Sequence, residues 1–265
     1  MSEGNAGVRV EDRGGVAVVR LDRPPLNVLD IAAIEALDAA LARVEDSEAA
    51  VAVIASSIPK AFCAGVDVKD HVPERLERMI LSFHAVFRRM HASRLVTIAA
   101  VRGACLGGGA ELALSCDLVV AEETARFGLP EIRLACFPPV GLAALADRYG
   151  PRLAELCLTG ETIDGAEAHR RGLTSRLVPE GKAEEAALEA AGSMASGSRA
   201  VLGLTARNLR RLSLPHFEHS LEKAERAYLG DLVREPDMHE GIRAFVEKRP
   251  PRYGARAPSR HQEGR

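Results

Sequence analysis

A glycine-rich turn is the part of this sequence best suited to chemistry. An apolar run at residues 95–101 leads into residues 103–109, which end in three consecutive glycines, and a second apolar stretch follows at 110–114. Consecutive glycines let the backbone approach a ligand closely, and the first N–H groups of a helix are unpaired donors at a positive dipole end. We therefore expect this turn to be a site for negative charge.

Glu111 follows the turn directly and decides which kind of negative charge fits. Gly103 and Gly108 have the spacing of a phosphate-binding loop, but Gly109 stands where that loop has its lysine. A carboxylate about 6 Å from a bound phosphate would oppose it by about 3 kcal/mol per charge pair at an effective dielectric of about 20. A carbonyl that becomes an oxyanion only during a reaction avoids most of this repulsion, which favours an oxyanion hole. The alternative is a packing turn in which Glu111 only complements the helix dipole.

The composition excludes several other classes of function. The chain has 265 residues, of which 47% are apolar and 27% charged, with a formal net charge of −2. This balance argues against a nucleic-acid or membrane partner, as does the absence of tryptophan among few aromatic residues. The five cysteines form no CxxC pair, so we expect no metal site and no disulfide framework, and a cytoplasmic location.

Hydrophobic patterning predicts an α/β fold in which apolar strands alternate with amphipathic helices. The predicted strands are 16–21, 50–55, 95–101 and 118–121, and the predicted helices are 31–45 (capped by Asp30), 76–90 and 110–115. From residue 183 to 248 the pattern is helical throughout. We expect the first eight residues to be disordered and residues 254–265 to form a flexible tail.

Three motifs in this order resemble the crotonase (enoyl-CoA hydratase/isomerase) family. They are AFCAGVDVK at 61–69, VRGACLGGGAELALSCD at 101–117 and ARFGLPEI at 125–132, and the segment AFVEKRP at 244–250 resembles the end of the family's chains. The resemblance implies a spiral core of (ββα) repeats at 8–196 and a helical C-terminal oligomerisation subdomain at 197–253. It also implies acyl-CoA thioester substrates, no cofactor beyond the CoA moiety, and a homotrimer or a dimer of trimers.

The same resemblance assigns roles to particular residues. The backbone N–H groups of Val66 and Gly108 would form the oxyanion hole, and Glu111 and Glu131 would be the catalytic acids and bases. Phe245 and Lys248, from the C-terminal segment, would contact CoA, and Lys248 would reach a CoA phosphate. The remaining residues expected along the CoA path are Ala64, Val66, Asp67, Val68, Lys69 and Gly108.

The pair of glutamates points to hydration of an enoyl-CoA. Adding water across a conjugated C=C requires a base for the water and an acid for the α-carbon, each contributing about 10²–10⁴ in rate. We assign the α-carbon proton to Glu131 and the water to Glu111. Two alternatives stay open, namely an isomerase that uses Glu131 alone and a non-catalytic acyl-CoA-binding protein.

Two further segments, 70–75 and 133–145, are similar to a branch of the family that hydrates cyclohexa-1,5-diene-1-carbonyl-CoA. Other chemistry-bearing residues have simpler interpretations. We predict that Cys63 and Cys105 are small core residues, that Asp117 fixes a loop, and that the arginine pairs 88–89 and 210–211 lie on solvated helix faces.

Overall fold

The computed structural model describes residues 6–254, in which strands and helices alternate through most of the chain. The strands are β1 (Val8–Asp12), β2 (Val16–Leu21), β3 (Val51–Ser56), β4 (Ala61–Cys63), β5 (Val96–Val101), β6 (Ala104–Leu106), β7 (Leu118–Glu122), β8 (Arg126–Gly128), β9 (Thr162–Asp164) and β10 (Arg176–Val178). The α-helices are α1 (Ile31–Glu45), α2 (Pro73–Ala92), α3 (Gly108–Ser115), α4 (Ala146–Tyr149), α5 (Pro151–Thr159), α6 (Gly165–Arg170), α7 (Ala183–Ala195), α8 (Arg199–Ser213), α9 (Phe217–Arg226) and α10 (Pro236–Val246).

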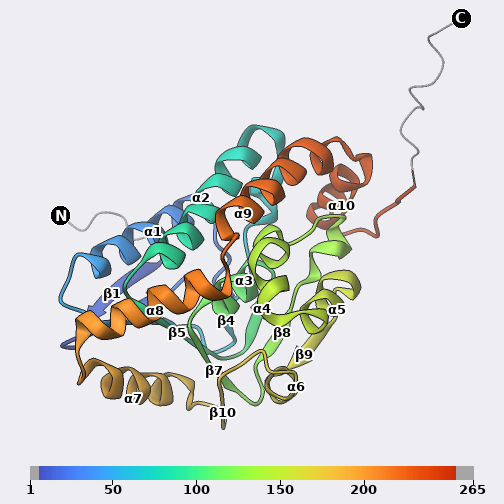
Figure 1. Ribbon diagram of the computed structural model, residues 1–265. Helices are drawn as coiled ribbons and strands as arrows, with labels where there is room; N and C mark the ends of the chain where they lie inside the picture. Colours follow the sequence, from blue (N-terminus) through green and yellow to red (C-terminus); the bar gives the residue numbers. More distant parts are fainter. Residues whose placement is uncertain (1–5, 255–265) are drawn as a thin grey trace, which may run out of the picture.

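Two sheets are built by a repeating strand–strand–helix unit. The larger sheet has the order β1-β2-β3-β5-β7-β10, and the smaller one has the order β4-β6-β8-β9. Units β3–β4–α2 and β5–β6–α3 each contribute one strand to each sheet, and β7–β8 continues the pattern. Neighbouring repeat strands pair in parallel, while the β1–β2 and β8–β9 pairs are antiparallel. The predicted (ββα) spiral is therefore confirmed (Figure 1).

The long elements form where the hydrophobic pattern predicts them. Strand β2 has the predicted bounds, β5 and β7 differ from the prediction by one residue at one end, and β3 is shifted by one residue at both ends. Helix α1 also has the predicted bounds, and the side chain of Asp30 caps it by accepting a hydrogen bond of 2.9 Å from the Ala33 N–H. Cys63 and Cys105 are fully buried core residues, as predicted.

The short strands were not predicted. Each strand of the smaller sheet has only three residues, which is too short for an alternating pattern to emerge. The expectation of disorder over the first eight residues is wrong at its end, because Val8 begins β1 and is 2% exposed. The rest of that expectation, residues 1–5, and the predicted tail beyond Gly254 lie outside the described residues.

Helices cover both faces of the larger sheet. Helix α7 packs on one face, where its alanines meet valines of β2, β3 and β5. On the other face lies the main core, to which α1, α2 and α3 contribute. The C-terminal helices α8 and α9 contact α2, as their orange and red ribbons show beside the teal helix in Figure 1.

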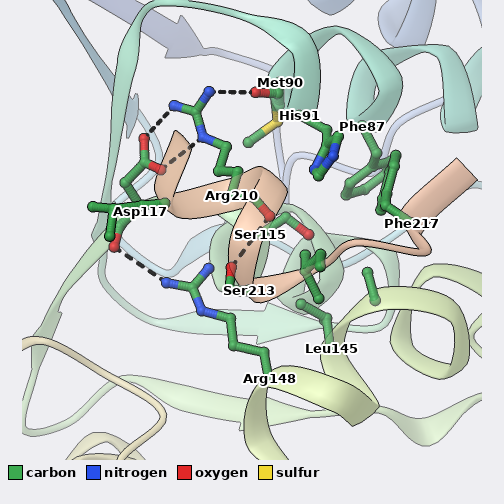
Figure 2. A pocket seen from close by; sticks show the side chains of 13 residues that line it. Phe87, Met90, His91, Ser115, Asp117, Leu145, Arg148, Arg210, Ser213 and Phe217 are labelled. Carbon is green, nitrogen blue, oxygen red and sulfur yellow. Dashed lines mark hydrogen bonds and ion pairs between the residues drawn. The ribbon is translucent and has the colours of Figure 1, made fainter. Parts of the chain in front are cut away.

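Arg210 lies against the core and not on a solvated face, which corrects the sequence prediction. It is 8% exposed, and its guanidinium donates to the Asp117 carboxylate and to the backbone carbonyls of Met90, Ser93 and Leu95. Figure 2 shows the contacts of Arg210 with Asp117 and Met90 beside a cavity of about 290 Å³ that residues of α2, α8 and α9 line. The interactions join α8 to the end of α2, and Asp117 has the structural role that we predicted.

Arg88 and Arg89 also differ from the prediction of a solvated face. Arg88 forms an ion pair of 2.8 Å with Glu225 of α9, and Arg89 forms one of 2.7 Å with Asp38 of α1. Sequence spacing does not reveal such partners, because they lie on other helices.

We expect Arg210→Ala to lower the free energy of unfolding by about 3–5 kcal/mol, because it leaves Asp117 and three carbonyls without their buried donor. Urea unfolding measures the effect. Arg211→Ala, at the exposed neighbouring position, is the matched control and should change stability by less than about 0.5 kcal/mol. Equal effects of the two substitutions would contradict the anchoring role of Arg210.

Candidate active site

Two glycine turns from different repeats touch each other at one end of the smaller sheet. Gly65 follows β4, and Gly107 follows β6 and precedes α3. A Cβ atom added at Gly65 would lie 3.1 Å from the Leu106 carbonyl oxygen and 3.4 Å from the Gly108 nitrogen. Gly65 also has a φ of +100°, which other residues rarely adopt. The glycine here allows direct contact between the two backbones.

The first turn leaves the Val66 N–H free of the neighbouring ladder. Leu29 donates its N–H to the Gly65 carbonyl and accepts a hydrogen bond from the Asp67 N–H, both at 2.9 Å. These two bonds use the Gly65 carbonyl and the Asp67 N–H, which lie on either side of the Val66 N–H. Neither bond involves the Val66 N–H itself.

The second turn leaves the Gly108 N–H free for a different reason. Helix α3 begins at Gly108, and the Glu111 N–H makes the 2.9 Å bond back to the Gly107 carbonyl. The N–H of Gly108 therefore precedes the first hydrogen-bonded turn of the helix. A Cβ added at Gly108 would lie 3.0 Å from Cγ2 of Val66, so the two N–H groups belong to backbone segments that pack directly together.

Glu111 projects from the first turn of α3 and is 2% exposed. One of its carboxylate oxygens, Oε1, accepts a hydrogen bond of 2.8 Å from the N–H of Gly141. Gly141 begins a π-helical turn, Gly141–Leu145, which directs this N–H at the carboxylate. Burial raises the pKa of Glu111, and the Gly141 hydrogen bond opposes that rise because it favours the ionised form.

Glu131 lies on a short 3-10 helix, Pro130–Leu134, which follows β8, the parallel neighbour of β6. Its Oε1 lies so close to Gly107 that an added Cβ there would be 2.8 Å away. Its Oε2 is buried and has no hydrogen-bond partner among residues 6–254. Burial raises the pKa of Glu131, and the neighbouring Glu111 charge raises it further.

These groups line one cavity of about 270 Å³. Seven of the predicted site residues belong to its wall: Ala64, Val66, Val68, Gly108, Glu111, Glu131 and Phe245. The cavity is otherwise mostly apolar, which strengthens hydrogen bonds made inside it. It combines two unpaired main-chain donors with two carboxyl groups, an arrangement that can polarise a carbonyl and transfer protons beside it.

Three predicted CoA contacts lie outside this wall. The Asp67 carboxylate accepts a hydrogen bond of 3.0 Å from the Lys69 N–H and caps the 3-10 helix Val68–His71. Lys69 and Lys248 are exposed on the surface.

Sequence reasoning missed the residues that close the cavity. Four of them come from α2 and the segment before it, and others follow Glu131 or lie near the C-terminus: His71, Met79, Ile80, Phe83, Leu134, Cys136, Phe137, Pro139 and Tyr228. Apart from His71, their types match those of ordinary core residues, so nothing in their spacing marks them as site residues. Segment 133–145, singled out by its resemblance, does supply part of this wall.

No group of three or more His, Cys, Asp or Glu side chains within residues 6–254 is arranged to hold a metal ion. In the same part of the chain, every helix is too short or too polar to cross a bilayer.

The (ββα) spiral and its cavity define a crotonase-type protein. The chain belongs to the enoyl-CoA hydratase/isomerase family, whose sequence model matches residues 11–256. It is 37% identical over 253 residues to a cyclohexa-1,5-dienecarbonyl-CoA hydratase of Thauera aromatica, covering 94% of this chain and 97% of the relative. It is 38% identical over 246 residues to a probable enoyl-CoA hydratase of Rhizobium meliloti (strain 1021), covering 91% and 95% of the two chains.

Solved structures agree with this assignment. An enoyl-CoA hydratase from Mycobacterium avium subsp. paratuberculosis K-10 superimposes with a TM-score of 0.83 at 26% identity, covering 94% of this chain and 99% of that one. A carnitinyl-CoA hydratase from Mycobacterium avium gives a TM-score of 0.78 at 32% identity, covering 95% and 99%.

We expect Glu131→Gln to stabilise the folded protein at neutral and alkaline pH. Because the folded-state pKa of Glu131 is raised, its contribution to stability is complete below the unfolded pKa of about 4.3 and is lost as the pH rises through the folded pKa. A glutamine at position 131 does not ionise, so the stability of the variant does not fall in this way as the pH rises. The free energy of unfolding, measured by urea titration, should therefore increasingly favour the variant as the pH rises above about 5.

Glu189→Gln, on the exposed face of α7, is the control and should show no such trend. A difference between Glu131→Gln and wild type that stays constant with pH would contradict a raised pKa at Glu131.

Proposed function

We propose that this protein is a hydro-lyase that adds water across the C=C bond of an enoyl-CoA thioester. The observation that carries the proposal is the meeting of Glu111 and Glu131 in one mostly apolar cavity, which the backbone segments of Val66 and Gly108 also line. The names of the Thauera and Rhizobium relatives support the same reaction.

The oxyanion hole begins the proposed mechanism. The thioester oxygen accepts hydrogen bonds from the Val66 and Gly108 N–H groups, which withdraw electron density from the conjugated alkene. These donors also stabilise the enolate that forms when the β-carbon is attacked. Losing one such donor costs about 10²–10³ in rate in other enzymes.

The two glutamates then supply the elements of water. Glu111, whose ionised form is favoured by the Gly141 N–H, takes a proton from water as the water oxygen bonds to the β-carbon. Glu131, whose pKa is raised both by burial and by the neighbouring Glu111 charge, gives its proton to the α-carbon. The product gains one OH and one H, and the proton left on Glu111 returns to Glu131 to complete the cycle.

The CoA moiety is the only cofactor-like group in this proposal, with no metal. We propose that Ala64, Asp67, Val68, Lys69 and Phe245 line its path, and that Lys248 reaches a CoA phosphate on its own or a neighbouring subunit. A cyclic dienoyl-CoA is the finer substrate proposal, supported by the name of the Thauera relative. We also propose a cytoplasmic location.

We expect Glu111→Gln and Glu131→Gln each to lower kcat for hydration by about 10²–10⁴, because each removes one proton-transfer group without changing shape. Loss of enoyl-thioester absorbance measures the rate, with crotonyl-CoA and a cyclic dienoyl-CoA as substrates. Glu189→Gln, the same change at an exposed position of α7, is the matched control and should keep its activity. Unchanged turnover in either glutamine variant would overturn the mechanism.

The same variants separate the alternatives. An isomerase that uses Glu131 alone would retain double-bond migration in Glu111→Gln. A non-catalytic protein would bind acyl-CoA in calorimetry and hydrate no thioester at all.

We further propose that residues 197–253 form the contact surface of a homotrimer or a dimer of trimers. The apolar residues of the segment 217–232 pack largely into the chain's own core, with Phe217, Leu221 and Tyr228 all buried. Support comes instead from α8, where Leu209 and Leu212 are 64% and 81% exposed. Exposed leucines on one helix face are typical of a partner surface.

We expect light scattering of the purified protein to give the mass of three or six chains, and Leu212→Glu to shift it toward the monomer because a charge would be buried at the contact. Arg211→Glu, at the adjacent exposed position, controls for the charge itself. A monomeric wild-type protein would contradict the proposal.

A further inference from the structure

An aromatic corner, formed by Phe137 and Tyr228, lines the same cavity as the two glutamates. Tyr228 lies on a π-helical turn, Ala227–Asp231, that follows α9, and its side chain is 2% exposed. The ring of Phe137 meets it edge to face, with centroids 5.0 Å apart. Both rings line the cavity. Tight packing in a buried corner of this kind leaves little room for either ring to move.

The hydroxyl of Tyr228 has a weak partner. It lies beside the Cys136 thiol, which in turn is 3.6 Å from the Leu134 carbonyl to which it donates. Sulfur is a poor hydrogen-bond acceptor, so this contact holds the phenol only loosely at its polar end. The position of the ring therefore depends mainly on its packing against Phe137 and the surrounding core.

The proposed mechanism fixes where each substrate atom lies relative to this corner. With the thioester oxygen at Val66 and Gly108, the α-carbon lies beside Glu131 and the β-carbon beside Glu111. The ring of Tyr228 lines the same cavity as both carboxyl groups. Burial raises the pKa of its phenol, and the charges of Glu131 and Glu111 raise it further. A substituent on the β-carbon that continues past the glutamates therefore runs into the tyrosine ring.

We propose that Tyr228 limits the acyl group to compact enoyl thioesters, such as a four-carbon chain or a six-membered ring, and excludes long linear chains. This inference rests on the proposed function. The whole cavity has about 270 Å³, part of which the thioester occupies. A cavity of about 150 Å³ accommodates a benzene ring, so the space left beside the thioester suits one ring better than a long chain.

The test compares crotonyl-CoA with trans-2-octenoyl-CoA as substrates of Tyr228→Ala. We expect the ratio of kcat/KM for octenoyl-CoA to that for crotonyl-CoA to rise at least about tenfold over wild type, a size typical of opening a pocket to added methylenes. Tyr228→Phe keeps the ring and should leave the ratio unchanged. An unchanged ratio in Tyr228→Ala, or an equal rise in Tyr228→Phe, would overturn the proposal.

Tyr149→Ala is the matched control for truncating a packed tyrosine. Its hydroxyl donates to the Leu114 carbonyl at 3.1 Å, and it does not line the cavity, so the ratio should not change. A rise there would show that loosening of the fold admits long chains, which would also overturn the role of Tyr228. If Tyr228→Ala does not fold, Tyr228→Leu opens less space and should raise the ratio in the same direction.

Binding of butyryl-CoA and octanoyl-CoA, measured by calorimetry, separates this proposal from the proposed function. If the wild-type protein hydrates no enoyl-CoA, the proposed function fails. The tyrosine proposal still predicts that Tyr228→Ala improves octanoyl-CoA binding relative to butyryl-CoA binding. Equal changes for the two ligands would overturn it independently of catalysis.

Discussion

Two glutamate side chains share one mostly apolar cavity, and the repulsion between their charges governs the rest of the site. Ionising both in an apolar surrounding is costly, so one keeps its proton near neutral pH. The structure makes the pair unequal. Glu111 accepts the Gly141 N–H, while Oε2 of Glu131 has no partner among the described residues. One residue type thereby supplies both the base and the acid of the proposed reaction. Keeping the two carboxyl groups together lowers the stability of the fold, and the packing of the surrounding core offsets this loss.

Sequence patterns predicted the helices and strands that are long enough to show a hydrophobic repeat. Helix α1 shows the period of an amphipathic helix together with its Asp30 cap, and β2 is an apolar run in which Arg20 is the one charged residue. The three-residue strands of the smaller sheet carry no such period, and their pairing depends on neighbours far away in the sequence. Arg210 shows the same limit for a side chain. Its charge indicated a solvated face, and only the folded chain brings Asp117 and three carbonyls to it.

In the candidate site, too, some residues could be predicted from the sequence and others could not. The glycine turns and both glutamates stand in motifs whose order is visible in the sequence, and the structure brings Glu111, Glu131, Val66 and Gly108 to one cavity. The contact of Gly65 with Gly108 explains why these turns need glycine, since a side chain would separate the two backbones. The wall beyond the glutamates was not predictable. Phe137 and Tyr228 are ninety-one positions apart and meet only through the packing of α9 against the core.

The protonation state of the glutamate pair tests the central claim most directly. Carbon-13 NMR of protein labelled at the glutamate side-chain carboxyls would follow each cavity carboxyl through a pH titration. The account predicts one carboxyl that is still protonated at neutral pH, with a resonance that disappears in Glu131→Gln. Two cavity carboxyls that both titrate near the ordinary glutamate pKa of about 4.3 would contradict it.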